Sequence, residues 1–499
     1  MNKLYSKMKR LVFLTISILL IMSSQLRAQE KSYSLEQVIE IAQNNSLDIQ
    51  IAKFELISNY WAYRTFKRGL LPQFNFTGEL PNLNRSFVNY TNPDGTESYL
   101  AQSYISYSGN LQVRKTIGFT GGNVFLSSGL QKVDNFSDSL RSHNYLSTPI
   151  NFGVSQPIFN YNPYKWSKKI EPLKYNEAKR KYLEASEQVR ITAVNYYFDL
   201  LQSQLNIEIQ QVNVQNYDTL YKLAQGRYSL GKIQENELLQ LELQLLQSKS
   251  SLELANLNYE NSLYKFKSFL RLSPEVKVIL LEPGAVDFII VDKNKALNYA
   301  MVNNSKILGF DRQIMQANSD LDRAKKENGF NANLYAVFGL TQNAPILGDA
   351  YYDLNNQQNV RLGVQVPIYD WGLRKGQVKM AESNLSIVKS SIEQQKIDFK
   401  QQIYLQVAEF NMQQNQLYIA AKSDTVAQRN YIITKNRYYL GKTTVTDLNI
   451  AQAANDQARL NYLRAIQKYW NSYFNLRKKT LFDFKNDKEL DVDYDKILQ

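Results

Sequence analysis

Apolar residues recur every seven positions in several stretches of the chain and predict long, laterally packed helices. In the stretch 234–272 the recurring residues are Leu238, Leu245, Leu252, Tyr259 and Phe266. In the stretch 444–480 a row of small residues recurs at the same spacing: Ala451, Ala458, Ala465 and Ser472. Large side chains facing small ones are typical of close antiparallel coiled-coil packing. We therefore expect a helical bundle or helical barrel, with an isolated rod or a bundle buried within one chain as the alternative.

Two further segments predict helices of unusual length. They cover residues 166–226 and 372–436, and the only proline in either is Pro172, in the first turns of the earlier one. At a rise of 1.5 Å per residue such helices are about 90 to 100 Å long. Helices this long are stabilised mainly by lateral packing, so their presence also favours a bundle.

Alternation of apolar and polar residues predicts strands within 72–158 and 331–368, although the face of the 331–340 run that begins with Asn331 and Asn333 is mixed. The apolar positions of three such runs are Phe74, Phe76 and Leu80; Ala332, Leu334, Ala336, Phe338 and Leu340; and Val360, Leu362, Val364 and Val366. Strands of about ten residues with one apolar and one polar face are typical of a barrel with lipid outside and water inside. A soluble sandwich alternates in the same way.

The chain contains two copies of the same pattern. Residues 227–232 (RYSLGK) return as 437–442 (RYYLGK), and residues 153–159 (GVSQPIF) return as 363–369 (GVQVPIY), both 210 positions later. Two unrelated motifs with one offset indicate a duplication. We expect a first repeat over 29–272 and a second over 293–480, joined by a linker over 273–292 and followed by a polar tail over 481–499.

Each repeat is expected to hold a helix, strands, a very long helix and a returning helix. The ranges are 34–69, 72–158, 166–226 and 234–272 in the first repeat, and 293–328, 331–368, 372–436 and 444–480 in the second. The initial helices align at an offset of 258–259 rather than 210, so residues 81–150 hold an insertion. It is either an elaborate outside loop or an additional hairpin in the wall.

The two repeated motifs mark turns. Gly231 and Gly441 permit a left-handed backbone at a helix end, and Arg227 and Arg437 complement the helix dipole in the last turn. These roles do not explain the other residues kept in both copies, which we expect to form a docking surface: Tyr228, Leu230, Tyr438 and Leu440. Four residues mark the turns from strand to long helix: Pro157, Pro367, Asp370 and Gly372.

The first residues have the composition of a targeting segment. Basic residues precede an apolar run over 11–22, which is too short to cross a bilayer as a helix, so we expect a signal peptide over 1–28. No other stretch is apolar and long enough to span as a helix. Any membrane-spanning part is therefore expected to be a β-barrel.

Charge and residue usage exclude several classes of function. The formal charge of the whole chain is +13, and once the basic first segment is removed the remaining field is too weak to indicate nucleic-acid binding. The chain has no cysteine and one histidine, His143. Disulfides, thiolate chemistry and an N-terminal cysteine lipid anchor are thereby excluded, and a catalytic triad or zinc site would need more. We expect no enzyme activity, no metal and no cofactor.

With these features the chain resembles the TolC-like outer-membrane efflux proteins over essentially the whole length after the signal peptide. The resemblance rests on the duplicated plan, on the stretch Pro367–Gly372 (PIYDWG) entering a long helix, and on the two Arg-Tyr-x-x-Gly turns. The first copy departs from the pattern, because Asn160 and Asn162 stand at the positions of Asp370 and Gly372.

The resemblance implies an α+β membrane protein that forms a homotrimer. Three chains would complete one transmembrane β-barrel in the outer membrane, continuous with a long α-helical coiled-coil barrel in the periplasm of a Gram-negative bacterium. The implied function is the channel of a tripartite efflux or type I secretion system, passively conducting substrates. The implied partners are a periplasmic adaptor (membrane fusion protein), an inner-membrane pump and outer-membrane lipid. The alternative is a periplasmic coiled-coil adaptor or scaffold of an export complex.

The resemblance also implies an acidic pore constriction near the helical tips. Asp447 lies six residues after Gly441 and falls on such a position, with Glu237 as its counterpart in the first repeat. A second acidic position one turn later is Ile450 here. The alternative role for Asp447 is to cap the returning helix, because acids are favoured in a first turn.

Overall fold

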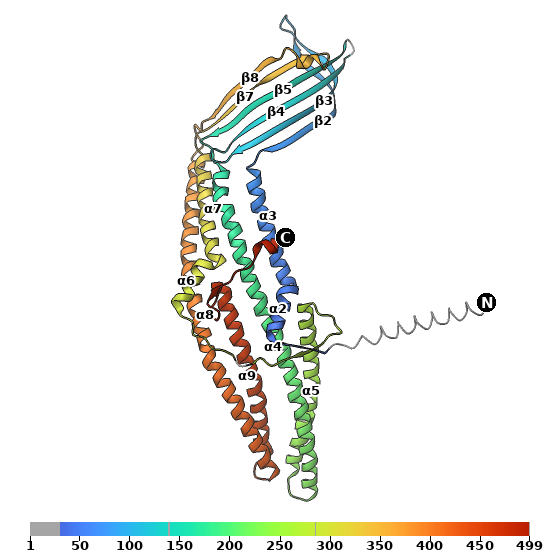
Figure 1. The fold of residues 1–499 in the computed structure, drawn as a ribbon, viewed down its shortest axis with the longest axis vertical. Helices are drawn as coiled ribbons and strands as arrows, with labels where there is room; N and C mark the ends of the chain where they lie inside the picture. The colour runs from blue at the N-terminus through green and yellow to red at the C-terminus, as the bar shows by residue number, and fades with distance from the viewer. Residues whose placement is uncertain (1–29, 138–139, 285, 499) are drawn as a thin grey trace, which may run out of the picture. The chain divides into compact units, whose positions relative to one another are not determined.

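The computed structural model describes residues 30–137, 140–284 and 286–498 of the chain, so the signal peptide expected at 1–28 lies outside the described residues. The described residues form two compact units (Figure 1). The sheet unit comprises residues 56–179 and 305–398, and the helical unit comprises residues 30–55, 180–304 and 399–498. Among the described residues, no helix has a stretch long and apolar enough to cross a membrane.

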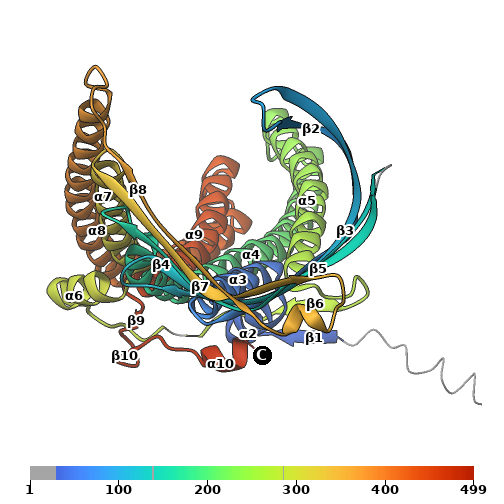
Figure 2. The same ribbon diagram turned by 90° about the horizontal axis from the view of Figure 1, so that it is seen from above.

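The sheet unit is built on one antiparallel sheet of six strands in the order β2-β3-β4-β5-β7-β8. The strands are β2 (Gln73–Thr91), β3 (Glu97–Ile117), β4 (Gly122–Ser137), β5 (Leu140–Ile158), β7 (Asn331–Ala344) and β8 (Asn355–Gln365). Seen from above, the sheet is strongly curved (Figure 2). Most described residues of the insertion at 81–150 belong to strands β2 to β5 of this sheet, so the insertion adds strands rather than an outside loop.

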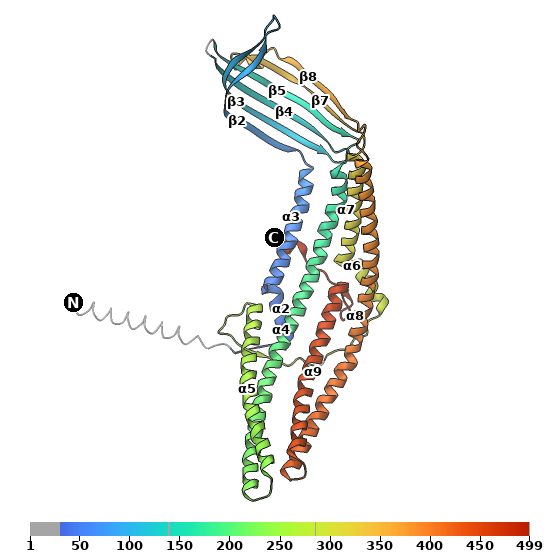
Figure 3. The ribbon, with the colours of Figure 1, turned by 180° about the vertical axis from the view of Figure 1, so that it is seen from behind.

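Four long helices carry most of the chain: α4 (Pro163–Ser229), α5 (Glu235–Leu270), α8 (Leu373–Tyr439) and α9 (Val445–Thr480). Helices α4 and α8 are each 67 residues long, and Pro172 lies inside α4 without ending it. Pro172 is the tenth residue of α4, so its position lacks the bond that an amide would donate to the Lys168 carbonyl, and the helix continues past it. Helices α4 and α5 form one hairpin and α8 and α9 a second, both ending in tight turns in the helical unit (Figure 3).

The prediction of single helices over 34–69 and 293–328 was wrong, because each is interrupted at one residue. The structure has α2 (Leu35–Asn45) and α3 (Leu47–Gly69), and α6 (Lys293–Asn303) and α7 (Ser305–Glu327). Ser46 and Asn304 separate them with an extended backbone, at ψ values of 148° and 137°. The Ser46 hydroxyl accepts from the backbone amide of Ile49 at 3.4 Å. The side-chain Nδ2 of Asn304 donates to the Lys479 carbonyl at 3.0 Å. The Ser46 bond caps the start of α3, and the Asn304 bond ties the second break to α9.

The linker and the polar tail expected at 273–292 and 481–499 both hold structure. Within the linker, β6 (Lys277–Leu280) pairs in parallel with β1 (Glu30–Tyr33). The tail contains the short strands β9 (Phe482–Asp483) and β10 (Lys488–Glu489) and the helix α10 (Tyr494–Leu498). Leu481 and Phe482 are buried, so the beginning of the tail belongs to the core of the helical unit.

Candidate functional site

The turns of the two helical hairpins have the same backbone geometry. Gly231 and Gly441 have positive φ angles of 67° and 69°. In each turn the glycine amide and the following lysine amide donate to carbonyls of the last helical turn at 2.9 Å, from Gly231 and Lys232 in one and from Gly441 and Lys442 in the other. This is the glycine helix ending that the repeated motif predicts. Both φ values lie where a side chain with a Cβ is disfavoured.

The two turns contact each other within the helical unit. The Arg227 guanidinium donates from Nη2 to the carbonyl of Tyr439 at 3.0 Å and lies 5.7 Å from the centre of the Tyr438 ring. The equivalent Arg437 instead donates to the carbonyl of Lys442, in its own turn, at 3.5 Å. The two arginines therefore differ in role, since Arg227 joins the hairpins and Arg437 closes one of them.

An apolar cluster lies beneath the turns and joins both hairpins. Its buried members come from all four long helices: Tyr217, Leu220, Ala224, Leu241, Leu245, Tyr438, Val445 and Leu448. Tyr438 is only 2% exposed, whereas the equivalent Tyr228 is 42% exposed. Burial raises the pKa of the Tyr438 phenol above its usual value. Of the two repeated tyrosines, one is a core residue and only the other is accessible.

Two leucines protrude from the turns into solvent. Leu230 and Leu440 are 70% and 69% exposed. The hollow between the turns is lined by backbone and polar side chains that include Gln240 and Thr446, which form a hydrogen bond at 3.4 Å. The ends of the hairpins thus present two exposed apolar side chains beside a polar hollow.

Asp447 caps the returning helix α9. Its Oδ2 accepts from the Thr444 hydroxyl at 2.7 Å and from the Thr444 amide at 3.2 Å, and the Thr444 hydroxyl accepts from the Asp447 amide at 3.1 Å. These bonds form a complete capping box. Hydrogen bonds from Thr444 and Thr443 lower the pKa of the Asp447 carboxyl. The carboxylate is also exposed. Glu237 is half-buried at the third position of α5, where Gln234 makes no side-chain cap.

Polar side chains join the hairpins farther from the turns, and the sequence pattern did not identify them. Asn213 of α4 donates to the Asp456 carboxylate of α9 at 2.8 Å, and the Tyr217 hydroxyl donates to Asn449 at 3.0 Å. Desolvation raises the pKa of the Asp456 carboxyl, and desolvation with the nearby Asp456 charge raises the pKa of Tyr217 to about 12. Their only sequence signal was a polar residue on a packed helix face.

A buried charge cluster ties the end of α9 to α4. Arg477 donates to Glu187 at 3.0 Å and to Asp483 at 3.1 Å, and the Tyr473 hydroxyl donates to Asp483 at 2.6 Å. Burial raises the pKa of the Glu187 carboxyl, although the positive charge of Arg477 opposes that shift. Because Asp483 belongs to the tail, this cluster fixes the tail against the helices.

One face of the six-stranded sheet is apolar. Consecutive register partners across five strands form an apolar row: Phe74, Val113, Leu126, Phe152 and Phe338. The neighbouring row continues it on four strands: Val124, Val154, Ala336 and Val360. Most of the large members of these rows are exposed. The expected alternation is therefore present, and it leaves a broad exposed apolar surface, which soluble monomers rarely have.

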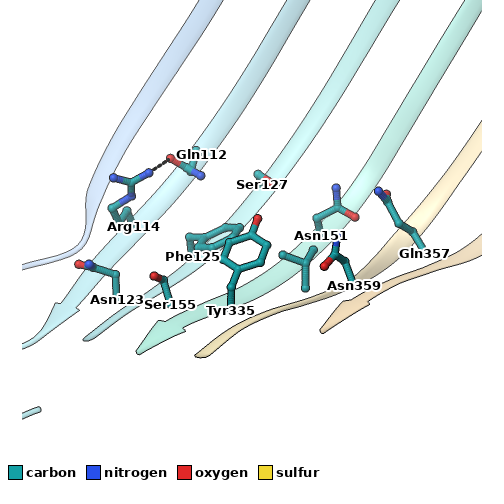
Figure 4. A pocket seen from close by; sticks show the side chains of 11 residues that line it. Gln112, Arg114, Asn123, Phe125, Ser127, Asn151, Ser155, Tyr335, Gln357 and Asn359 are labelled. Carbon is teal, nitrogen blue, oxygen red and sulfur yellow. Dashed lines mark hydrogen bonds between the residues drawn. The ribbon is translucent and has the colours of Figure 1, made fainter. Parts of the chain in front are cut away.

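The opposite face is polar and hollowed (Figure 4). One row of register partners crosses all six strands: Asn75, Gln112, Ser127, Asn151, Gly339 and Gln357. Arg114 donates to Gln112 at 3.0 Å, and the rings of Phe125 and Tyr335 stack with their centres 6.3 Å apart. A Cβ at Gly153 would overlap the Phe125 ring, so this glycine gives the ring its place. The face can line a water-filled space.

The strand-to-helix turns differ between the repeats. In the second, the Asp370 carboxylate accepts from the amides of Gly372 and Arg374 at 3.1 Å each, and Gly372 has a φ of 87°. In the first, Asn162 accepts from the amides of Tyr164 and Lys165 at 3.0 and 3.2 Å. The capping residue is thus Asn162 and not Asn160, which aligns with Asp370. Pro157 lies within β5 opposite Asn333, and Pro367 follows β8.

We compared the chain with protein-family models, curated proteins and solved structures. A family model described as outer membrane efflux protein matches residues 123–268 and 337–480, together more than half of the chain. The fold is similar to the crystal structure of the Campylobacter jejuni CmeC outer membrane channel, with 18% identity, 93% of this chain and 88% of that chain covered, and a TM-score of 0.65. Sequence comparison with curated proteins gave no significant match.

Two further solved structures share the fold. The outer membrane protein VceC from Vibrio cholerae is 14% identical, with 89% of this chain and 95% of that chain covered and a TM-score of 0.58. The open state of the Neisseria gonorrhoeae MtrE outer membrane channel is 13% identical, with 92% and 91% covered and a TM-score of 0.59. Both likenesses cover nearly the whole chain, and the family model matches both sequence repeats. The chain therefore belongs to the outer membrane efflux protein family.

Proposed function

We propose that three copies of this chain assemble into a passive outer-membrane export duct. Membership of the outer membrane efflux protein family confirms the resemblance predicted from the repeated motifs. It places the chain in the outer membrane as an efflux channel component and decides against a periplasmic adaptor. The observation that carries the proposal further is the curved sheet with one apolar face, one polar face and two unpaired edges.

The unpaired edges are β2 and β8. Edge strands expose amide and carbonyl groups that pair readily with another chain. In a bilayer each unpaired group costs on the order of several kcal/mol. Pairing of β2 of one copy with β8 of the next satisfies both edges. Six strands from each of three copies then close a barrel of eighteen strands, with the apolar face toward lipid and the polar face toward water.

The helical hairpins form the second part of the proposed duct. Contacts within one chain leave part of the apolar surface of the hairpins uncovered. Many large apolar side chains of α5 and α8 are exposed: Leu239, Leu243, Leu246, Leu254, Leu257, Ile387, Leu405 and Ile433. Helices of neighbouring copies cover these positions in a helical barrel. A periplasmic adaptor docks at the accessible turn residues Leu230, Leu440 and Tyr228, held in place by Gly231 and Gly441, and couples the duct to an inner-membrane pump.

The acidic constriction is a further part of the proposal. Three copies of Asp447 brought close to one axis repel each other and attract cations. The capping box supports helix α9 through the same carboxylate, so capping and pore lining are compatible. Glu237 is the first-repeat counterpart.

Introduced cysteines test the closure of the sheet. The chain has no cysteine of its own, so a pair placed on the two edges has no competing thiol. We test Asn75→Cys with Gln357→Cys and further pairs in which the second cysteine is shifted along β8, because the register between copies has to be sampled. We expect at least one of these pairs to give a disulfide-linked trimer on denaturing gels. Ser127→Cys alone, on the central strand β4, is the matched control and should stay unlinked. Absence of linkage for every edge pair in membrane-inserted protein would overturn the closure.

A further inference from the structure

A hollow opens where the β3–β4 turn lies beside the first turns of α4, wholly within the sheet unit. Its apolar lining includes Leu70, Ile117, Phe119 and Val124. Its remaining lining includes four lysines: Lys115, Lys165, Lys168 and Lys169. Among the described residues that line it, none is acidic. Such a combination of apolar surface and clustered positive charge fits an amphiphile with an anionic head.

The hollow lies on the apolar face of the sheet. Lys115 pairs with Val124 and so begins the apolar row that continues through Val154, Ala336 and Val360. Phe119, at the tip of the turn, is 84% exposed. A lysine at the end of a lipid-facing row keeps its stem on apolar surface and its ammonium at the polar boundary. The hollow is thus continuous with the surface that faces lipid in the proposed barrel.

Hydrogen bonds hold the turn against the helix. The buried Asn162 side chain donates from Nδ2 to the Gly118 carbonyl at 3.1 Å while its Oδ1 caps α4. Gln156 donates to the Thr120 carbonyl at 3.3 Å. The walls are therefore fixed by the chain itself, and a ligand would enter a preformed site.

The charges around the hollow are not balanced by neighbouring side chains. Lys165, Lys168 and Lys169 lie in the first turns of α4, and its first turn holds no acidic residue. Positive charge there opposes the helix dipole. In the described part of the chain these three lysines and Lys115 form no ion pair, and Glu171, the nearest acid along α4, is paired with Lys174 at 2.8 Å. A bound anion would offset the repulsion among the lysines and the repulsion between the lysines and the positive end of the helix dipole.

We infer that this hollow binds an anionic phospholipid of the periplasmic leaflet. An acyl chain lies against Leu70, Phe119 and Val124, and the phosphate lies among the lysine ammonium groups and the α4 amino end. The inference rests on the proposed function, because it requires the apolar face to lie in lipid. Since the chain has no cysteine for a thiol-linked lipid, a bound headgroup would also help fix the depth of the protein in the membrane.

Native mass spectrometry of the full, detergent-purified protein tests this inference. Phosphatidylglycerol and phosphatidylcholine with the same acyl chains are added at equal concentration, and the retained lipids are counted. We expect preferential retention of phosphatidylglycerol. Each basic residue near an anionic headgroup contributes about fivefold to binding, so Lys165→Gln/Lys168→Gln/Lys169→Gln should reduce that preference by about tenfold or more.

The matched control removes three charges elsewhere on the chain. Lys389→Gln/Lys400→Gln/Lys422→Gln changes exposed lysines of α8 and should leave the preference unchanged. Equal retention by the α4 variant and the wild type would overturn the inference. Displacement of phosphatidylglycerol by millimolar inorganic phosphate would also overturn it, because the site would then hold phosphate alone.

A separate measurement distinguishes failure of the inference from failure of the proposed function. Insertion of the wild type into lipid vesicles is followed by heat-modifiable electrophoretic mobility. Protein that inserts but shows no lipid preference contradicts only the lipid site. Protein that does not insert contradicts the proposed duct as well.

Discussion

At the scale of residues, the proposed duct gives the Asp447 carboxylate two roles, in the capping box of α9 and in the pore lining. Its hydrogen bonds to Thr443 and Thr444 use one oxygen, Oδ2, which leaves the charge exposed. These bonds lower the carboxyl pKa below its ordinary value of 3.8. The capping contribution is therefore fully present above about pH 4 and is lost as the pH falls below 3.8 through the lowered pKa of the folded protein.

Two substitutions of Asp447 separate capping from pore lining. Asp447→Asn removes the charge but keeps an acceptor oxygen, whereas Asp447→Ala removes both. If the ring forms, both should weaken block by divalent cations and cation selectivity in single-channel recordings, and only the alanine variant should lower thermal stability. The alanine variant loses only the half of the capping box that the carboxylate makes, because the Thr444 hydroxyl still accepts from the amide of residue 447. Unchanged selectivity and block in both variants would leave Asp447 as a cap alone.

Arg477 offers a second test at the residue scale. Its guanidinium bonds two buried carboxylates, those of Glu187 and Asp483. Arg477→Met leaves Asp483 without its cation and Glu187 with Arg190 alone, whose Nε lies 3.1 Å from the carboxylate. Breaking a buried pair typically costs about 3 to 5 kcal/mol. We expect a matching drop in the free energy of unfolding measured by denaturant titration. Lys468→Met, at an exposed position of the same helix, is the control and should change stability by less than about 0.5 kcal/mol.

At the scale of elements, the hairpin turns depend on two glycines. A β-branched side chain at Gly231 or Gly441 would be forced into a left-handed backbone, at a cost of about 1 to 2 kcal/mol. That cost falls on the turn and not on the sheet. We expect Gly441→Val to insert normally into the outer membrane but to lose adaptor binding and drug resistance.

The control for this prediction adds the same bulk without the backbone strain. Gly226 lies near the C-terminal end of α4, just before the turn of the first hairpin. A Cβ at this position meets no atom within 4 Å. Gly226→Val should therefore bind adaptor as the wild type does. Resistance at the wild-type level in Gly441→Val, at equal expression, would refute the role of the turn in docking.

The sequence predicted the elements whose signals extend over many residues. Heptads predicted the returning helices α5 and α9, and long stretches nearly free of proline predicted α4 and α8. Alternation predicted strands such as β8, with Val360, Leu362 and Val364 on one face. Short or local features were missed for physical reasons. The helices are interrupted at Ser46 and Asn304 by one extended residue each, without a glycine or proline. Strand β6 has only four residues, too few for a periodic signal.

The candidate site was predicted only in part. The glycine turns followed from the motif itself, because a left-handed helix end requires glycine. The repeat also suggested that Tyr228 and Tyr438 are equivalent, but one is exposed and the other buried, because the two turns pack against each other asymmetrically. The cap at Asn162 and the bonds of Arg477 depend on contacts between distant segments. A single polar residue in a sequence does not reveal such contacts.

At the scale of the whole molecule, an apolar sheet face, two open strand edges and exposed apolar helix positions all remain uncovered within one chain. In the proposed duct, lipid covers the apolar sheet face, and further copies of the chain cover the strand edges and the exposed helix positions. One arrangement covers all three surfaces: a closed ring of chains around a water-filled axis. The six strands per chain further predict a wide, eighteen-strand wall if three copies close it.

The most direct test is the subunit count of the purified particle, determined by electron microscopy of the protein in lipid nanodiscs. We predict threefold symmetry, with one ring of strands enclosed by lipid and one tube of helices outside it. A monomeric particle that does not associate with lipid would contradict the account.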